Sequence, residues 1–237
     1  MDKKNFKVII LCGGLGSRLS SETKKIPKPM VKIGKIPILV HIINIYHKYG
    51  FKDFILALGY KQSVIINYFK KNKINGVNIR LVDTGKKTLT GTRLLKLKKF
   101  INEENFLLTY GDGLCDIDLN KLVKFHLKKK KIATVTAVRP PARFGELFLK
   151  KNLVEKFDEK NHVNSGWING GFFVFNKKIF KHIPKKQCML EKEPIQKLTF
   201  KKELAAYKHN SFWQCMDTLR DKELLNNIWK YDKKKWI

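Results

Sequence analysis

Short apolar runs alternate with amphipathic stretches in the first half of the chain, and this alternation predicts strands and helices in turn. Branched apolar residues predict buried strands at 8–11, 54–58, 78–82 and 106–110. Helical spacing of apolar residues predicts helices between them, over 37–50, 62–71 and 90–101. Pro37 opens the first of these helices and Gly50 closes it. Such units favour a parallel sheet whose ligands bind beyond the carboxyl ends of the strands.

The second half of the chain mixes elements less regularly. The pattern predicts helices over 119–129, 177–183, 191–201 and 219–229. It predicts a strand over 133–138, a hairpin of 144–149 with 153–157, and further strand at 168 and 172–175. No repeat or linker interrupts the chain. We therefore expect one α/β domain over 1–237, with a mixed, mostly parallel sheet flanked by helices.

A glycine-rich segment follows the first strand. Gly13, Gly14 and Gly16 allow positive φ angles and let a ligand approach the main chain closely. Successive N–H groups in such a loop bind anions, and a following helix N-terminus adds its dipole. Arg18 stands where the loop becomes helix, placed to bind phosphate oxygens, and Lys28 lies between two prolines that stiffen its backbone. A tight turn with a solvated Arg and Lys is the alternative.

The spacing of this segment, G-G-x-G-x-R with a lysine twelve residues after Gly16, is that of neither a Walker A loop nor a dinucleotide fingerprint. With Pro27-Lys28-Pro29-Met30-Val31 it resembles the signature of sugar-1-phosphate nucleotidyltransferases, and most closely the glucose-1-phosphate cytidylyltransferase branch. The resemblance covers nearly the whole chain. It implies the Rossmann-like nucleotide-diphospho-sugar transferase fold, with a nucleotide half at about 1–115, a sugar half at about 116–237, and a homo-oligomer.

Two aspartates are candidate metal ligands. Asp112 lies between two glycines at the end of a strand, so its carboxylate faces the ligand crevice, and Asp217 is the second candidate. Mg²⁺ prefers one or two carboxylates together with substrate phosphates and water. As alternatives, Asp112 is a turn residue and Asp217 caps the helix that follows. The resemblance implies that both positions hold the metal.

The resemblance also implies the binding residues. The nucleotide would be surrounded by Leu11, Cys12, Gly13, Gly14, Leu15, Gly16, Ser17, Arg18, Lys28, Thr88, Arg93 and Gly111, with Arg18 and Lys28 catalytic. The sugar phosphate would meet Glu159, Lys160, Asn169 and Gly170. Without the resemblance, the sequence predicts that Arg93 lies on a helix surface. It likewise predicts a hairpin turn at Asn169-Gly170-Gly171. Asn161 stands where the family has a proline after Glu-Lys.

The formal charge of +30, from 50 Lys+Arg against 20 Asp+Glu, would suit a nucleic-acid binder. The lysine runs lack the interleaved aromatics of a stacking platform, however, so we expect no specific nucleic-acid binding. Compositional drift with solvated lysines explains the excess, and the same field attracts acidic substrates such as nucleoside triphosphates. Four scattered cysteines, no long apolar run and no signal peptide predict a cytoplasmic protein without membrane insertion.

The resemblance, together with these observations, implies a Mg²⁺-dependent enzyme that takes CTP and a sugar 1-phosphate, first of all glucose 1-phosphate. It would release pyrophosphate and make a CDP-sugar for surface polysaccharide. The same fold acting on UTP or dTTP is one alternative. A non-catalytic, nucleotidyltransferase-like binding protein is the other, and the presence of both Asp112 and Asp217 argues against it.

Overall fold

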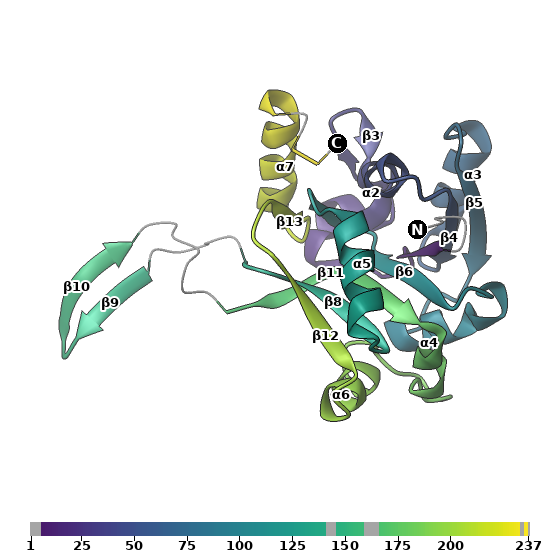
Figure 1. The fold of residues 1–237 in the computed structure, drawn as a ribbon. Coiled ribbons are helices and arrows are strands. Elements are labelled where there is room, and N and C mark those ends of the chain that lie inside the picture. Colours follow the sequence, from purple (N-terminus) through teal and green to yellow (C-terminus); the bar gives the residue numbers. More distant parts are fainter. Residues whose placement is uncertain (1–5, 141–145, 159–165, 233–234, 237) are drawn as a thin grey trace.

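The computed structural model describes residues 6–140, 146–158, 166–232 and 235–236. Its centre is a seven-stranded sheet in the order β12-β8-β11-β6-β1-β4-β5 (Figure 1). The pairs β1–β4, β1–β6, β4–β5 and β8–β12 are parallel, whereas β11 runs antiparallel to both of its neighbours. The expected mixed, mostly parallel α/β sheet is therefore confirmed. The strands are β1 (Lys7–Leu11), β4 (Asp53–Leu58), β5 (Asn78–Asp83), β6 (Asn105–Tyr110), β8 (Ala133–Val138), β11 (Ile168–Asn176) and β12 (Leu204–His209).

Each face of this sheet is covered by its own apolar core, and β1 shows why. Its alternate side chains Val8 and Ile10 pack into one core, while Ile9 and Leu11 pack into the other. The first core receives α2 (Ile38–Lys48), α3 (Gln62–Lys71), α5 (Leu119–Lys129) and α7 (Leu219–Tyr231). The second core receives α4 (Thr90–Lys96) and α6 (Glu193–Phe200). Because both faces are buried, the central strands are continuous apolar runs.

Several short elements lie outside the main sheet. Three two-stranded ribbons pair β2 (Lys32–Ile33) with β3 (Ile36–Pro37), β7 (Gly113–Cys115) with β13 (Trp213–Cys215), and β9 (Glu146–Lys150) with β10 (Leu153–Asp158). The third is the predicted hairpin, which lies apart from the main sheet (Figure 1). The remaining turns are η2 (Ser17–Leu19), α1 (Ser20–Thr23), η3 (Lys28–Met30), η4 (Lys98–Phe100) and η5 (Lys177–Lys181).

The helix predicted over 90–101 is too long. It ends at Lys96, and the chain then tightens into η4 through bonds from Phe100 N to Leu97 O (2.9 Å) and from Ile101 N to Lys98 O (3.2 Å). The segment predicted as helix over 177–183 is likewise the 3₁₀ turn η5. Apolar spacing of three or four residues suits both helix types, so the sequence pattern does not separate them. Pro37 closes β3 and precedes the first residue of α2, rather than opening the helix itself.

Within the described ranges, no helix has both the length and the apolar character needed to cross a membrane.

A buried histidine makes stability depend on pH. His126 of α5 is 2% exposed and contacts Thr134 Oγ1 (2.9 Å) and Asn105 Oδ1 (3.2 Å). Burial lowers its pKa to about 4 from an ordinary value of 6.5. Between these pH values the unfolded chain binds the proton and the folded chain does not. Acidification through this window should therefore remove on the order of 3 kcal/mol of the free energy of unfolding.

Urea unfolding at several pH values measures this effect. His126→Gln should flatten the loss of stability between pH 6.5 and 4, whereas His47→Gln, at a more accessible histidine, should leave the slope unchanged. Parallel curves for the wild type and His126→Gln would contradict the prediction.

Candidate functional site

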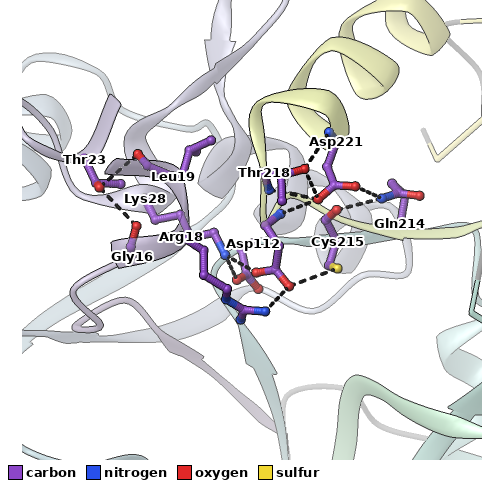
Figure 2. Close-up of polar contacts among 11 residues, drawn as sticks. Gly16, Arg18, Leu19, Thr23, Lys28, Asp112, Gln214, Cys215, Thr218 and Asp221 are labelled. Carbon is purple, nitrogen blue, oxygen red and sulfur yellow. Dashed lines mark hydrogen bonds and ion pairs between the residues drawn. The ribbon is translucent and has the colours of Figure 1, made fainter. Parts of the chain in front are cut away.

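The glycine loop begins where β1 ends at Leu11. Gly16 has φ of +65°, and a Cβ there would lie 2.9 Å from Thr23 Cγ2 and 3.0 Å from Lys28 Cβ, so glycine is required. Thr23 Oγ1 lies 3.0 Å from both Gly16 O and Leu19 O and shares its one proton between them, which fixes the end of the loop (Figure 2). Only the short turns η2 and α1 follow. The expected helix dipole is therefore small, and anion binding falls to the main-chain N–H groups and to side chains.

Arg93 supports this loop from behind. The residue is 2% exposed, and its guanidinium donates to Gly13 O (3.2 Å), Leu58 O (2.6 Å), Gly85 O (3.2 Å) and Thr88 O (2.8 Å), and to Thr84 Oγ1. A Cβ on Gly13 would overlap the guanidinium. The alternative of a helix-surface arginine is wrong, because five acceptors from separate segments converge on this side chain. Arg93 thus ties the glycine loop to the segment that carries Thr88.

A cavity of about 580 Å³ opens beneath the glycine loop. Its walls include all the residues predicted to surround the nucleotide: Leu11, Cys12, Gly13, Gly14, Leu15, Gly16, Ser17, Arg18, Lys28, Thr88, Arg93 and Gly111. Asp112 and Asn169 also reach it. The fold thus gathers these residues around one space, and their contacts with a nucleotide stay a prediction. Sequence reasoning did not select eight further wall residues: Pro29, Lys86, Lys87, Leu89, Thr90, Tyr110, Met189 and Glu191.

Lys28 lies at the centre of a charged cluster. Its side chain is nearly buried, and Nζ donates to Asp112 Oδ2 (2.7 Å) and Asp217 Oδ1 (2.6 Å). Arg18 Nη1 lies 2.8 Å from Asp217 Oδ2, and its side chain remains largely exposed. Figure 2 shows Arg18 and Lys28 directed toward the Asp112 region from the loop side. Two cations and two carboxylates, from four separate segments, therefore meet at one point.

The charges of this cluster support one another. Burial alone would lower the pKa of Lys28, but the Asp112 and Asp217 carboxylates raise it above its usual value. Burial alone would raise the pKa of Asp217, but the hydrogen bond and charge of Lys28, with Arg18, bring it below its usual value. At neutral pH the ammonium and the Asp217 carboxylate are both charged.

A small ribbon brings the two aspartates together. Strands β7 and β13 pair antiparallel, with Gly113 opposite Cys215, and Met216 N donates to Asp112 O at 2.9 Å. Asp112 immediately precedes β7, and Asp217 follows β13 by two residues. The ribbon is therefore the device that joins positions more than a hundred residues apart.

Asp217 does not cap the helix that follows it. Thr218 is the N-cap of α7, since its Oγ1 accepts from Asp221 N (3.2 Å) while Asp221 Oδ2 accepts from Thr218 N (2.8 Å). Asp221 Oδ2 also accepts from Asp217 N at 3.0 Å. This capping box leaves the Asp217 side chain to the charged cluster. Sequence reasoning missed Asp221, although the spacing Thr218-x-x-Asp221 signals such a box.

A second cavity, of about 660 Å³, adjoins the first. Both cavities are lined by Arg18, Tyr110, Asp112 and Asn169. Asn169 and Gly170 do not form a hairpin turn: they lie within β11, where the register with β8 shifts. Gly170 O accepts from Trp213 Nε1 at 2.7 Å, which joins β11 to the ribbon. Glu159 and Lys160 lie outside the described residues.

A further cavity, of about 780 Å³, lies away from this chemistry, where β6 and β8 begin. Lys130, Lys131, Lys178 and Lys201 contribute to its walls. Lys130 and Lys201 directly follow the last residues of α5 and α6, where cations offset the partial negative charge of helix ends. Lys130 and Lys201 thus have a structural explanation.

The sequence model of the family described as Nucleotidyl transferase matches residues 7–226. The chain belongs to the nucleotidyl transferase family. Nucleotidyl transferases are enzymes, so the expectation of an enzyme is confirmed, and the fold of the solved relatives below agrees with the predicted fold class.

Relatives of this nucleotidyl transferase cover nearly its whole length. The glucose-1-phosphate cytidylyltransferase of Salmonella typhimurium is 42% identical over 252 residues, which is 97% of this chain and 98% of the relative. The D-glycero-alpha-D-manno-heptose 1-phosphate guanylyltransferase of Campylobacter jejuni is 39% identical over 176 residues, 73% of this chain and 77% of its own. The solved structure of HddC from Yersinia pseudotuberculosis superposes with a TM-score of 0.75 at 26% identity, covering 94% of this chain and 99% of that one.

Nucleotidyl transferases of this family use a divalent metal ion. The charged cluster fits one: Asp112 Oδ2 and Asp217 Oδ1 both lie within 2.7 Å of a single cationic group, so the two carboxylates already converge on one positive charge. Carboxylate oxygens are the donors that hard divalent cations prefer. Arg18 and Lys28 add positive charge beside this pair, which suits phosphate ligands.

Arg93 gives a first test of the site's architecture. Arg93→Lys keeps the charge but supplies three donors from one atom in place of the guanidinium fork, so several buried acceptors would lose their partner. The free energy of unfolding should fall by about 3 kcal/mol, and the glycine loop should loosen enough to raise the KM for the nucleoside triphosphate. Urea unfolding and steady-state kinetics measure both. Arg80→Lys, at an exposed arginine, is the matched control, and equal behaviour of the two variants would refute the role of Arg93.

Proposed function

We propose that this nucleotidyl transferase transfers the cytidylyl group of CTP to a sugar 1-phosphate, first of all glucose 1-phosphate. The products are CDP-glucose and pyrophosphate. The observation that carries the proposal is the convergence of Lys28, Asp112 and Asp217 at the place where two cavities meet. The 42% identity to a glucose-1-phosphate cytidylyltransferase over 97% of the chain supports the choice of substrates.

In the proposed reaction, an oxygen of the sugar phosphate attacks the α-phosphorus of CTP. A new phosphorus–oxygen bond forms as the bond to the bridging oxygen breaks, and pyrophosphate leaves in line with the attack. Phosphoryl and nucleotidyl transfers ask the protein for positioning and charge stabilisation more than for covalent chemistry. The triphosphate would be positioned, and its charge stabilised, by the N–H groups of Gly13 to Gly16 and by the cations Arg18 and Lys28.

We infer that the divalent metal is Mg²⁺ and that Asp112 and Asp217 hold it. When bound, it would neutralise and orient the reacting phosphates. Lys28 keeps the two carboxylates close to each other, and the Asp221 bond to Asp217 N holds the second in place. The chain thus fixes both metal ligands before substrate arrives.

The sugar side of the proposal uses the second cavity. Asn169 and Gly170 belong to β11 and stand beside the charged cluster, and Asn169 reaches both cavities. Glu159 and Lys160 remain the sequence-based candidates for the sugar hydroxyls and the sugar phosphate. We also keep the expectation of a homo-oligomer, which light scattering of the purified protein measures, and that of a cytoplasmic location, which cell fractionation measures.

A substrate panel tests the function. Pyrophosphate release should be measured for CTP, UTP, dTTP and GTP, each with several sugar 1-phosphates. CTP with glucose 1-phosphate should be the best pair. GTP belongs in the panel because a relative at 39% identity is a guanylyltransferase. Faster turnover with another triphosphate would move the proposal to that nucleotide, and no release with any pair would refute it.

A further inference from the structure

A chain of hydrogen bonds joins the walls of the two cavities. Tyr110 OH donates to Glu191 Oε1 at 2.6 Å, and Asn169 Nδ2 donates to Tyr110 OH at 3.4 Å. Thr90 Oγ1 donates to Glu191 Oε2 at 2.6 Å. These four residues come from α4, the end of β6, β11 and the segment before α6. Tyr110 and Asn169 line both cavities, whereas Glu191 lines the one beneath the glycine loop.

The donor and acceptor of each hydrogen bond in this series follow from which groups can only donate and which can only accept. Gly171 N can only donate, and it lies 2.8 Å from Asn169 Oδ1, so the Asn169 amide must turn its NH₂ toward Tyr110. Tyr110 can accept from that NH₂ only if its own proton points elsewhere. The Glu191 carboxylate accepts only and takes this proton. Glu191 therefore decides that Tyr110 presents an acceptor to Asn169.

The residues at both ends of this series of hydrogen bonds are held firmly. A Cβ on Gly171, whose φ is +80°, would lie 2.7 Å from Tyr110 Cδ2, so the ring is seated directly against that backbone. The Glu191 segment docks on the start of α4 through bonds from Gly91 N to Cys188 O (3.0 Å) and from Leu190 N to Thr90 Oγ1 (2.8 Å).

We propose that Glu191 is a positioning residue for the sugar 1-phosphate. By accepting the Tyr110 proton, it makes Tyr110 hold Asn169 as a hydrogen-bond donor toward an oxygen of the sugar 1-phosphate. The amide nitrogen of Asn169 has two N–H groups: one binds Tyr110, and the other serves the ligand. The inference rests on the proposed function, because it assigns this donor to the sugar side of the same site.

Three variants test the proposal. Tyr110→Phe removes only the linking oxygen, and Glu191→Gln keeps the size of the side chain but no longer accepts at both ends. Glu193→Gln, at an exposed glutamate two residues away, is the matched control. Tyr110→Phe and Glu191→Gln should each raise the KM for glucose 1-phosphate about tenfold while the KM for CTP changes less than about twofold. The double variant should resemble the single ones, because both changes cut the same link.

Thermal unfolding of each variant separates positioning from a merely structural role. A structural role would lower the melting temperature and move both KM values together, and that result would overturn the proposal. So would kinetic constants equal to those of Glu193→Gln. If Glu191→Gln does not fold, the two KM values of Tyr110→Phe alone test the proposal. Calorimetry with glucose 1-phosphate on the wild type separates failure of the proposed function from failure of the role of Glu191. If the wild type neither binds glucose 1-phosphate nor turns over, the proposed function is refuted as well. If the wild type is active and the variants are unaffected, only the role of Glu191 is refuted.

Discussion

Asp112→Asn and Asp217→Asn are each expected to reduce turnover by more than about a thousandfold. Either change removes one of the two charges that converge on the proposed metal position beside Lys28. Asparagine retains an oxygen that can accept from Lys28, so the packing around the ammonium should survive. Each variant should therefore lose turnover but keep the folded structure and thermal stability of the wild type.

Pyrophosphate release across a range of Mg²⁺ concentrations, with thermal unfolding of each variant, measures this expectation. Chelation should abolish turnover of the wild type, and Mg²⁺ should restore it. Asp232→Asn, at an exposed aspartate after α7, is the control and should behave as the wild type does. Near-normal activity of Asp217→Asn at every Mg²⁺ concentration would show that Asp217 is no metal ligand.

The regular elements follow from local patterns. The bounds of α3 and α5 agree with those predicted, because each helix has apolar residues at helical spacing along its length. Strand β12 was not predicted: its residues alternate between partly buried and exposed positions at the sheet edge, so its apolar signal is weak. The three-residue strands β7 and β13 are too short to show any alternation.

The part of the candidate site that could be predicted from the sequence is the part whose residues form a motif. The glycine loop, Arg18 and Lys28 lie within one short stretch whose spacing is distinctive. The meeting of Asp112 with Asp217 depends instead on pairing of the unpredicted ribbon, and only the resemblance suggested it. Long-range pairing of this kind leaves no local signature in the sequence.

Arg93 and Glu191 show the remaining difficulty. The sequence around Arg93 describes an ordinary amphipathic helix, because the carbonyls that bind its guanidinium belong to other loops. Glu191 lies in a stretch predicted as helix, whereas α6 begins only at Glu193 with Pro194 beside it. Its partners Tyr110 and Thr90 are about eighty and one hundred residues away. Hydrogen bonds between distant segments follow from the fold and not from local spacing.

Lys28→Ala and Lys160→Ala are expected to separate the two substrates. Lys28 lies in the charged cluster beneath the glycine loop, so its charge serves the phosphates at the reacting centre. Removal of a cation aimed at developing charge costs about 10²–10³ in rate, so Lys28→Ala should reduce kcat. Lys160 belongs to the proposed sugar side, and loss of a ground-state phosphate contact mainly raises KM. Lys160→Ala should therefore raise the KM for glucose 1-phosphate with little change in that for CTP.

Arginine should be a poor substitute at position 28. The Lys28 side chain is nearly buried, and its ammonium fits between two carboxylate oxygens at 2.6 and 2.7 Å. A planar guanidinium needs more room and would push these carboxylates apart. Steady-state kinetics with each substrate varied in turn decide the matter, with Lys150→Ala, an exposed lysine of the hairpin, as the control. If Lys160→Ala weakens CTP binding and spares glucose 1-phosphate, the nucleotide and sugar halves of the site have been assigned the wrong way round.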